Sequence, residues 1–165
     1  MSYQVRLSYE TVEFLEELKK MYEEIEHKPI VKGEVLNRAY YDSQWVESWQ
    51  DIYIRKIKLN GKYDIKENSL RPRLQITVDV EQGIKKLKLE IAEQLGLRSV
   101  TIGVVIRLIL KAALIKNNFS GENDISYIFP KYKKEVEKEF QGEQKEKVLQ
   151  LLKKMEIEIN KVLGK

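Results

Sequence analysis

Two stretches of the chain share one order of patterns: a short alternating segment followed by two segments with helical periodicity. In the first stretch, residues 4–8 alternate polar and apolar side chains, which predicts a half-buried strand. Apolar side chains then recur at helical spacing, and the helical pattern resumes over residues 31–41 after an interruption. The first apolar face comprises Leu15, Leu18, Tyr22 and Ile25. Residues 1–43 are therefore predicted to form one strand and two helices.

The second stretch has the same order between residues 72 and 117. Residues 73–78 alternate like the first strand, and Asp79 begins a pattern typical of a helix cap. Gly96 favours the end of the next helix because glycine tolerates left-handed backbone angles, and Ser99 is a candidate cap for the last one. The face of the first of these helices is apolar (Val80, Ile84, Leu87, Ile91 and Leu95). The second is apolar almost all round, which predicts burial on several sides.

A shift of 69 positions superposes the two stretches without a gap, and we interpret this as an internal repeat. The shift places Val5 on Leu74, Leu18 on Leu87 and Arg38 on Arg107. A single short strand leaves its backbone groups without partners, so the two strands are predicted to pair with each other. The polar side chains on their outer face are Gln4, Arg6, Ser8, Arg73, Gln75 and Thr77.

These features resemble the ribbon-helix-helix family of DNA-binding proteins, which includes the Arc, MetJ and CopG-type repressors. The resemblance rests on the strand Arg73-Leu74-Gln75-Ile76-Thr77-Val78, its helix, Gly96-Leu97-Arg98-Ser99 and the helix that follows. It covers residues 3–42 and 72–117, and two units in one chain are similar to the TraY-type arrangement. The resemblance implies that an antiparallel ribbon enters the major groove of DNA while the N-terminus of each second helix holds a backbone phosphate.

The outer strand positions hold side chains that suit base recognition. Arginine pairs with guanine through two donors, glutamine pairs with adenine through a donor and an acceptor, and serine or threonine serves either base. The six outer residues named above are therefore the predicted base-reading set. Helix N-termini collect phosphates because their free amides and positive dipole end face the anion. The predicted phosphate contacts in the second unit are Arg98, Ser99, Val100 and Thr101.

The first unit departs from the family pattern before its second helix. It has His27-Lys28-Pro29 where the family has glycine followed by a hydroxyl cap, so Lys32 and the amides near Gly33 are the candidate phosphate contacts there. The fold class expected is thus mainly α-helical with a short two-stranded antiparallel ribbon, arranged as a tandem ribbon-helix-helix pseudo-dimer.

Residues 44–71 and 118–165 lie outside the two units. In the first of these segments, Trp45 and Trp49 are predicted to extend the preceding helix, with packing favoured over base stacking. A small β-hairpin is predicted across residues 60–62, with Ile57 and Leu59 facing Tyr63 and Ile65. Residues 117–126 read as a loop, and a helical tail follows from about residue 131, with Gly142 as a break. Its apolar stripe comprises Val148, Leu151, Leu152, Met155, Ile159, Val162 and Leu163, and residues 148–163 are a candidate self-association surface.

Charge is distributed unevenly. Residues 1–43 hold six basic and nine acidic side chains, whereas residues 71–117 hold nine basic and four acidic ones. A polyanion would therefore prefer the second segment. The chain has no cysteine, and no apolar run or signal peptide suggests a membrane, so a cytoplasmic protein is expected.

Enzyme chemistry has little support in the residues. His27 is the one histidine and lies in a turn-like stretch, and no phosphate-cradling glycine loop or zinc-ligand spacing occurs. We expect no catalytic residue, no metal site and no cofactor. The predicted function is sequence-specific binding of double-stranded DNA as a transcriptional repressor or plasmid copy or maintenance regulator. The alternatives are an accessory protein of a relaxosome, whose partner would be a relaxase, and an antitoxin-type interaction protein, whose partner would be a toxin.

Overall fold

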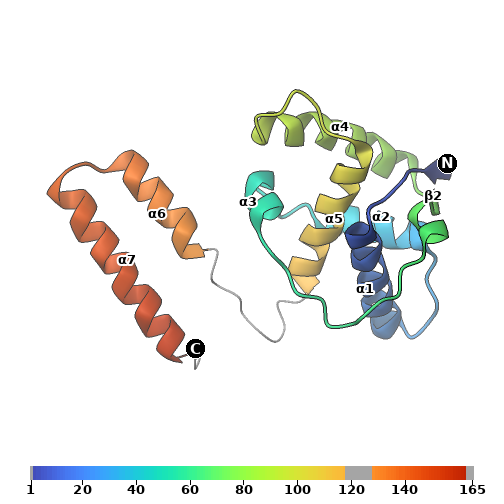
Figure 1. The fold of residues 1–165 in the computed structure, drawn as a ribbon, viewed down its shortest axis with the longest axis horizontal. Helices are drawn as coiled ribbons and strands as arrows, with labels where there is room; N and C mark the ends of the chain where they lie inside the picture. The colour runs from blue at the N-terminus through green and yellow to red at the C-terminus, as the bar shows by residue number, and fades with distance from the viewer. Residues whose placement is uncertain (1, 118–127, 163–165) are drawn as a thin grey trace. The chain divides into compact units, whose positions relative to one another are not determined.

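The computed structural model describes residues 2–117 and 128–162, which belong to two compact units within residues 1–121 and 122–165 (Figure 1). Its described part is mainly helical with one small antiparallel sheet, as the sequence predicts. The first unit contains β1 (Ser2–Gln4), α1 (Tyr9–Glu26), α2 (Lys32–Asp42), α3 (Trp49–Ile54), the 3-10 helix η1 (Glu67–Leu70), β2 (Arg73–Gln75), α4 (Val78–Gln94) and α5 (Ile102–Asn117). The second contains α6 (Ile128–Glu139) and α7 (Glu143–Val162). The predicted loop lies almost wholly outside the described residues, as does Leu163.

The two strands pair with each other inside one chain, so the ribbon needs no second copy. β1 is antiparallel to β2, with Tyr3 opposite Leu74 and Gln4 opposite Arg73 (Figure 1). The first strand is shorter and earlier than the predicted residues 4–8. Pro72 explains why the ladder ends early: it occupies the next position of the register after Arg73, and it has no backbone N–H to donate. Beyond it the same register resumes, since the amide of Leu7 donates to the carbonyl of Leu70 over 2.7 Å.

The inner face of the ribbon and the helices share one hydrophobic core. Leu7, Leu74 and Ile76 are buried in it, whereas their neighbours along the chain are exposed. Helix α5 lies at its centre, in contact with α1, α2, α3 and α4, which confirms the burial predicted from its apolar surface. One predicted face residue is wrong: Ile25 lies in the last turn of α1 and is exposed.

The helix caps differ in part from the predicted ones. Ser8 and Thr77 are the N-caps of α1 and α4, so the prediction of Asp79 as a cap is wrong. At the start of α5, the hydroxyl oxygen of Thr101 accepts a hydrogen bond from the amide of Val104, so Thr101 takes the capping role predicted for Ser99. In both helices a threonine hydroxyl, rather than the predicted side chain, accepts a hydrogen bond from an amide of the first turn. Gly96 does follow the end of α4 in the left-handed region, as predicted.

Several structural features recur 69 residues apart. The caps Ser8 and Thr77 have this spacing, and each accepts an amide three residues further on. His27 and Gly96 also have this spacing, and each has a positive φ just after a helix of the first unit. A serine or threonine cap and a left-handed helix end therefore occur at matching positions of both stretches.

The prediction that both tryptophans extend the second helix is wrong. Helix α2 ends at Asp42, where the hydroxyl of Ser43 donates to the carbonyl of Tyr40. Trp45 lies in the turn that follows and donates from its indole to the carbonyl of Ala112 over 3.2 Å. Trp49 begins the separate helix α3 and is buried, so the packing role expected for it is confirmed.

The predicted β-hairpin is absent from the described sheet, which contains only β1 and β2. Instead, Glu17 on α1 binds the turn of this segment. Its buried carboxylate accepts the amides of Asn60 and Gly61 and the hydroxyl of Tyr63. The turn amides thus pair with a side chain rather than with a facing strand, and Ile57, Leu59 and Ile65 pack against the core.

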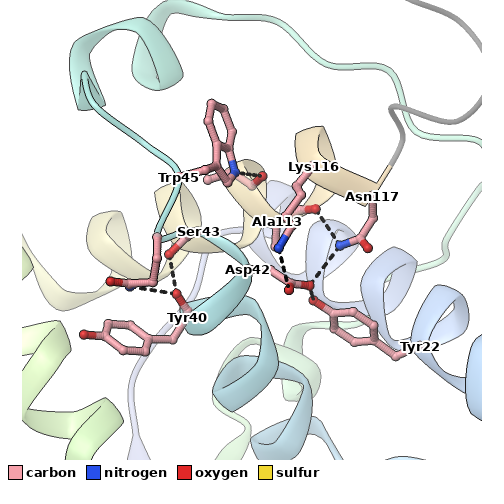
Figure 2. A network of polar contacts seen from close by, with 10 residues as sticks. Tyr22, Tyr40, Asp42, Ser43, Trp45, Ala113, Lys116 and Asn117 are labelled. Atoms are coloured by element: carbon pink, nitrogen blue, oxygen red, sulfur yellow. Dashed lines mark hydrogen bonds and ion pairs between the residues drawn. The ribbon is translucent and has the colours of Figure 1, made fainter.

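A polar network joins the C-terminal ends of α2 and α5 to α1 (Figure 2). The Asp42 carboxylate accepts hydrogen bonds from the hydroxyl of Tyr22 (2.6 Å) and from the side-chain amide of Asn117 (3.0 Å). The Nζ atom of Lys116 lies 3.4 Å from Oδ1 of the same carboxylate. Burial alone would raise the pKa of the Asp42 carboxyl, but these hydrogen bonds and the lysine charge outweigh burial and lower the pKa. The network fixes the helices that carry the ribbon.

We expect Asp42→Asn to cost about 1–3 kcal/mol of stability near neutral pH, because charged hydrogen bonds are lost. Since the folded pKa of Asp42 lies below its unfolded value, its contribution is present above the unfolded pKa and is lost as the pH falls through the folded pKa. Urea unfolding should therefore show a large difference from wild type at neutral pH and a smaller one in acid. An equal difference at both pH values would contradict this role.

The second unit is a pair of helices joined at Gly142, which has a positive φ, as predicted for a break. Phe129 and Val136 of α6 are buried, but no residue of α7 is. On the apolar stripe of α7, Val148, Leu152 and Ile159 are half-buried. Leu151, Met155 and Val162 are exposed, so a large part of the stripe remains uncovered within this unit.

Candidate nucleic-acid interface

The outer face of the ribbon carries the predicted base-reading residues. Gln4, Arg6, Arg73 and Gln75 are all exposed and alternate with buried or half-buried apolar residues. Ser8 and Thr77 are exposed as well, but their hydroxyl oxygens accept helix amides as N-caps. Their positions are those predicted, while their hydroxyls already serve the fold. The four long side chains are thus the part of the set that can reach outward.

Arg71 is a further member of this face that the sequence analysis missed. It is exposed, and the register that joins Leu7 to Leu70 places it opposite Arg6. The alternation of residues 71–76 contained the signal, because Arg71 is two positions before Arg73. Pro72 made the segment resemble a connection rather than the continuation of a strand.

The arginines of the chain divide into two groups. Arg38 is paired with Glu26 and Glu34, and Arg107 lies 3.9 Å from Glu10. Arg55 also has an interaction partner. By contrast, three arginines of the ribbon and one arginine before α5 form no ion pair with a carboxylate of the described residues. These four are Arg6, Arg71, Arg73 and Arg98. In the part of the chain that the structure describes, all the arginines of the ribbon are therefore without a carboxylate counter-ion.

The N-terminus of α5 adjoins the first strand's extension. A methyl group placed on Gly103 would lie 3.2 Å from the carbonyl oxygen of Arg6, so the helix start and the ribbon are in close contact. Arg98, Ser99 and Thr101 are exposed before this helix, whereas the side chain of Val100 is buried. Of the predicted phosphate contacts in this unit, Val100 can therefore offer only its backbone.

The N-terminus of α2 adjoins the second strand in the same way, but it is less open. Gly33 is buried against the backbone of Gln75. Lys32 lies 3.4 Å from Glu16, and the N-cap Val31 provides no side-chain cap. The two helix starts thus flank opposite ends of the ribbon, and the one at α5 has the unpaired cation.

The first unit also has a pocket away from the ribbon. An open pocket of about 500 Å³ lies between α1 and residues 57–63, with Glu10, Glu13, Lys58 and Lys62 among its lining. It contains none of the predicted site residues. Among the described residues, no group of three or more histidine or acidic side chains is placed to hold a metal ion.

Comparison with known proteins gives no relative. No family model matches the chain, and neither a curated protein nor a solved structure matches it. Among the described residues, no helix has the length and apolar character needed to cross a membrane.

Proposed function

We propose that this protein binds double-stranded DNA by placing its two-stranded ribbon in the major groove. The observation that carries the proposal is the outer face of the ribbon, on which Arg6, Arg71 and Arg73 are exposed and form no ion pair with a carboxylate of the described residues. A two-stranded ribbon fits the width of the major groove, and arginine and glutamine recognise guanine and adenine there.

The fold would then be a tandem ribbon-helix-helix pseudo-dimer, with units at residues 1–43 and 72–117. Three features support this. Gln4 and Arg73, which are 69 positions apart, pair at the centre of the ribbon. The helix caps and left-handed helix ends have the same spacing. The second helix of each unit begins against the strand of the other, since Gly33 adjoins Gln75 and Gly103 adjoins Arg6.

Phosphate binding is proposed for the start of α5 more than for the start of α2. The first amides of a helix have no partner within it, and the dipole adds positive charge there. Arg98 and Thr101 are exposed at this point, whereas Lys32 at the other helix is paired with Glu16.

We expect Arg98→Ala to weaken binding to every duplex sequence to a similar extent and to flatten its salt dependence. Loss of one phosphate contact reduces the slope of log K against log salt by about 0.9 for B-DNA. Fluorescence anisotropy with a labelled duplex at several salt concentrations measures this slope. Lys20→Ala, which removes an exposed charge from α1, is the matched control. An unchanged slope for Arg98→Ala would show that the start of α5 does not face DNA.

The biological role proposed first is a repressor or a plasmid copy or maintenance regulator in the cytoplasm, associated with the nucleoid or a plasmid. An accessory role beside a relaxase would use the same surface. Footprinting on genomic and plasmid fragments separates the two, because a promoter site supports regulation and a transfer origin supports the relaxosome. The antitoxin alternative predicts a toxin bound by residues 122–165, and co-purification of a partner protein with that segment tests it.

Self-association through α7 is proposed as the way in which neighbouring DNA-bound copies contact each other. Leu152, Met155, Ile159 and Val162 follow a spacing of three, four and three residues, which suits a helix-helix seam. Of these, Met155 and Val162 are exposed in the second unit. Burying a large apolar side chain of this kind contributes about 1.5–3 kcal/mol, so packing against the α7 helix of a second copy would stabilise the association.

Leu151→Glu combined with Met155→Glu should therefore abolish cooperative occupation of two adjacent sites while leaving affinity for a single site unchanged. The measurement is a titration of duplexes that contain one or two copies of the preferred site. Ile157→Glu is the matched control, because Ile157 is also exposed on α7 but lies on the opposite side from Met155. Unchanged cooperativity in the double variant would exclude this seam.

A further inference from the structure

The ribbon has two unlike ends. Its outer face pairs Ser2 with Gln75 at one end and Gln4 with Arg73 at the centre. The hydrogen bond from Leu7 to Leu70 continues the register and places Arg6 opposite Arg71 at the other end. We call Arg6 and Arg71 the arginine end, and Ser2 and Gln75 the glutamine end.

The surroundings reinforce this difference. Gly103, in the first turn of α5, adjoins Arg6 at the arginine end, and the exposed Arg98 precedes this helix. The start of α2, where Lys32 is paired with Glu16, adjoins Gln75 at the glutamine end. Positive charge available to a ligand is therefore concentrated at one end of the ribbon.

Arg6 and Arg71, which face each other across the ribbon, do not stabilise the free protein. Like charges directly opposite each other on paired strands are destabilising, and neither Arg6 nor Arg71 has an ion pair with a carboxylate in the described part of the chain. Both side chains are exposed, so they contribute nothing to the core. An anionic ligand with closely spaced acceptors relieves this repulsion, and guanine offers two acceptors in the major groove next to the phosphates.

We propose that the ribbon reads DNA with a fixed polarity, in which the arginine end contacts guanines and the glutamine end contacts A·T pairs, with Arg71 as a specificity-determining residue. This inference rests on the proposed function. It follows that the preferred site is not palindromic: its guanines gather on the side bound by Arg6 and Arg71. It also follows that Arg71 favours binding at the expense of the stability of the free protein.

The test uses the full chain and a pool of double-stranded oligonucleotides with a randomised central segment. Selection with the wild type should enrich a site with guanines at one end. Arg71→Gln should lose preference for guanine at one position of that end, with a loss of affinity on the order of tenfold for the selected site. Gln75→Arg should add a guanine preference at the opposite end. Lys86→Gln, an exposed cation on α4, is the matched control and should leave the selected sequence unchanged.

A second readout separates a binding role from a structural one. The thermal midpoint of free Arg71→Gln should be equal to or about 1–3 °C above that of wild type, because the cross-strand repulsion is removed. A lowered midpoint would contradict the inference, and so would a selected site with guanines placed symmetrically about its centre. Equal losses in Arg71→Gln and Lys86→Gln would also overturn it while leaving the proposed function intact. Failure of the wild type to bind any duplex would overturn the proposed function itself.

Discussion

Replacing Arg6 and Arg73 together with alanine should abolish sequence-specific DNA binding and leave the fold intact. Each arginine that contacts guanine through two hydrogen bonds contributes about 1–3 kcal/mol of discrimination. If the two contributions add, the preferred site should be bound about 30-fold to about 20,000-fold more weakly. Anisotropy titrations with the selected duplex and with an unrelated duplex measure both the loss and the remaining non-specific affinity.

The matched control removes two positive charges elsewhere on the same unit. Lys20 and Lys86 are exposed on α1 and α4, so their double alanine variant has the same net charge as the arginine variant. It should keep its preference for the selected site. Circular dichroism should show no lowering of the thermal midpoint for either variant, because all four side chains are exposed. If both variants lost affinity equally, net charge rather than the ribbon would account for binding.

Gly33→Ala should destabilise the ribbon unit strongly, by about 3 kcal/mol. A methyl group at this position would meet the backbone of Gln75, with the amide nitrogen only 2.6 Å away. A backbone segment paired in a sheet cannot turn aside as a flexible side chain can, so α2 and β2 must separate. Overpacking of this kind costs about 1–3 kcal/mol and more where the neighbour is rigid. Urea unfolding monitored by tryptophan fluorescence measures the loss.

Gly103→Ala, in the first turn of α5, is the control. Its methyl group would lie 3.2 Å from the carbonyl of Arg6, a contact that a small shift can relieve. The cost should therefore be much smaller than that of Gly33→Ala. Equal stability of the two variants would contradict the close approach of α2 to the second strand.

The periodicity of the chain was sufficient to predict most of the described helices and the pairing of the two strands. The alternation of residues 73–76 identified the outer face, because side chains in a strand point to opposite sides in turn. The helical face of α4 and the burial of α5 followed from apolar spacing in the same way. These features depend on neighbours along the chain, which the sequence displays directly.

Contacts between distant residues explain what the sequence did not predict. The turn at residues 60–61 binds Glu17 on α1, and an alternating pattern cannot reveal that a buried carboxylate replaces a facing strand. The cap positions were misplaced by two residues because several hydroxyl or carboxyl side chains compete near each helix start. Arg71 was missed because Pro72 interrupts the ladder without ending the register.

The central claim is that the outer face of the ribbon binds DNA, and the arginine side chains report on it directly. In a two-dimensional NMR spectrum of the Nε–Hε groups, each arginine gives its own signal, assigned by single Arg→Lys variants. On addition of the selected duplex, the signals of Arg6, Arg71, Arg73 and Arg98 should shift, while those of Arg38 and Arg107, which contact acidic residues of the body, should stay in place. Shifts confined to Arg38 and Arg107, or an unchanged spectrum of the ribbon arginines in the presence of bound DNA, would contradict the account.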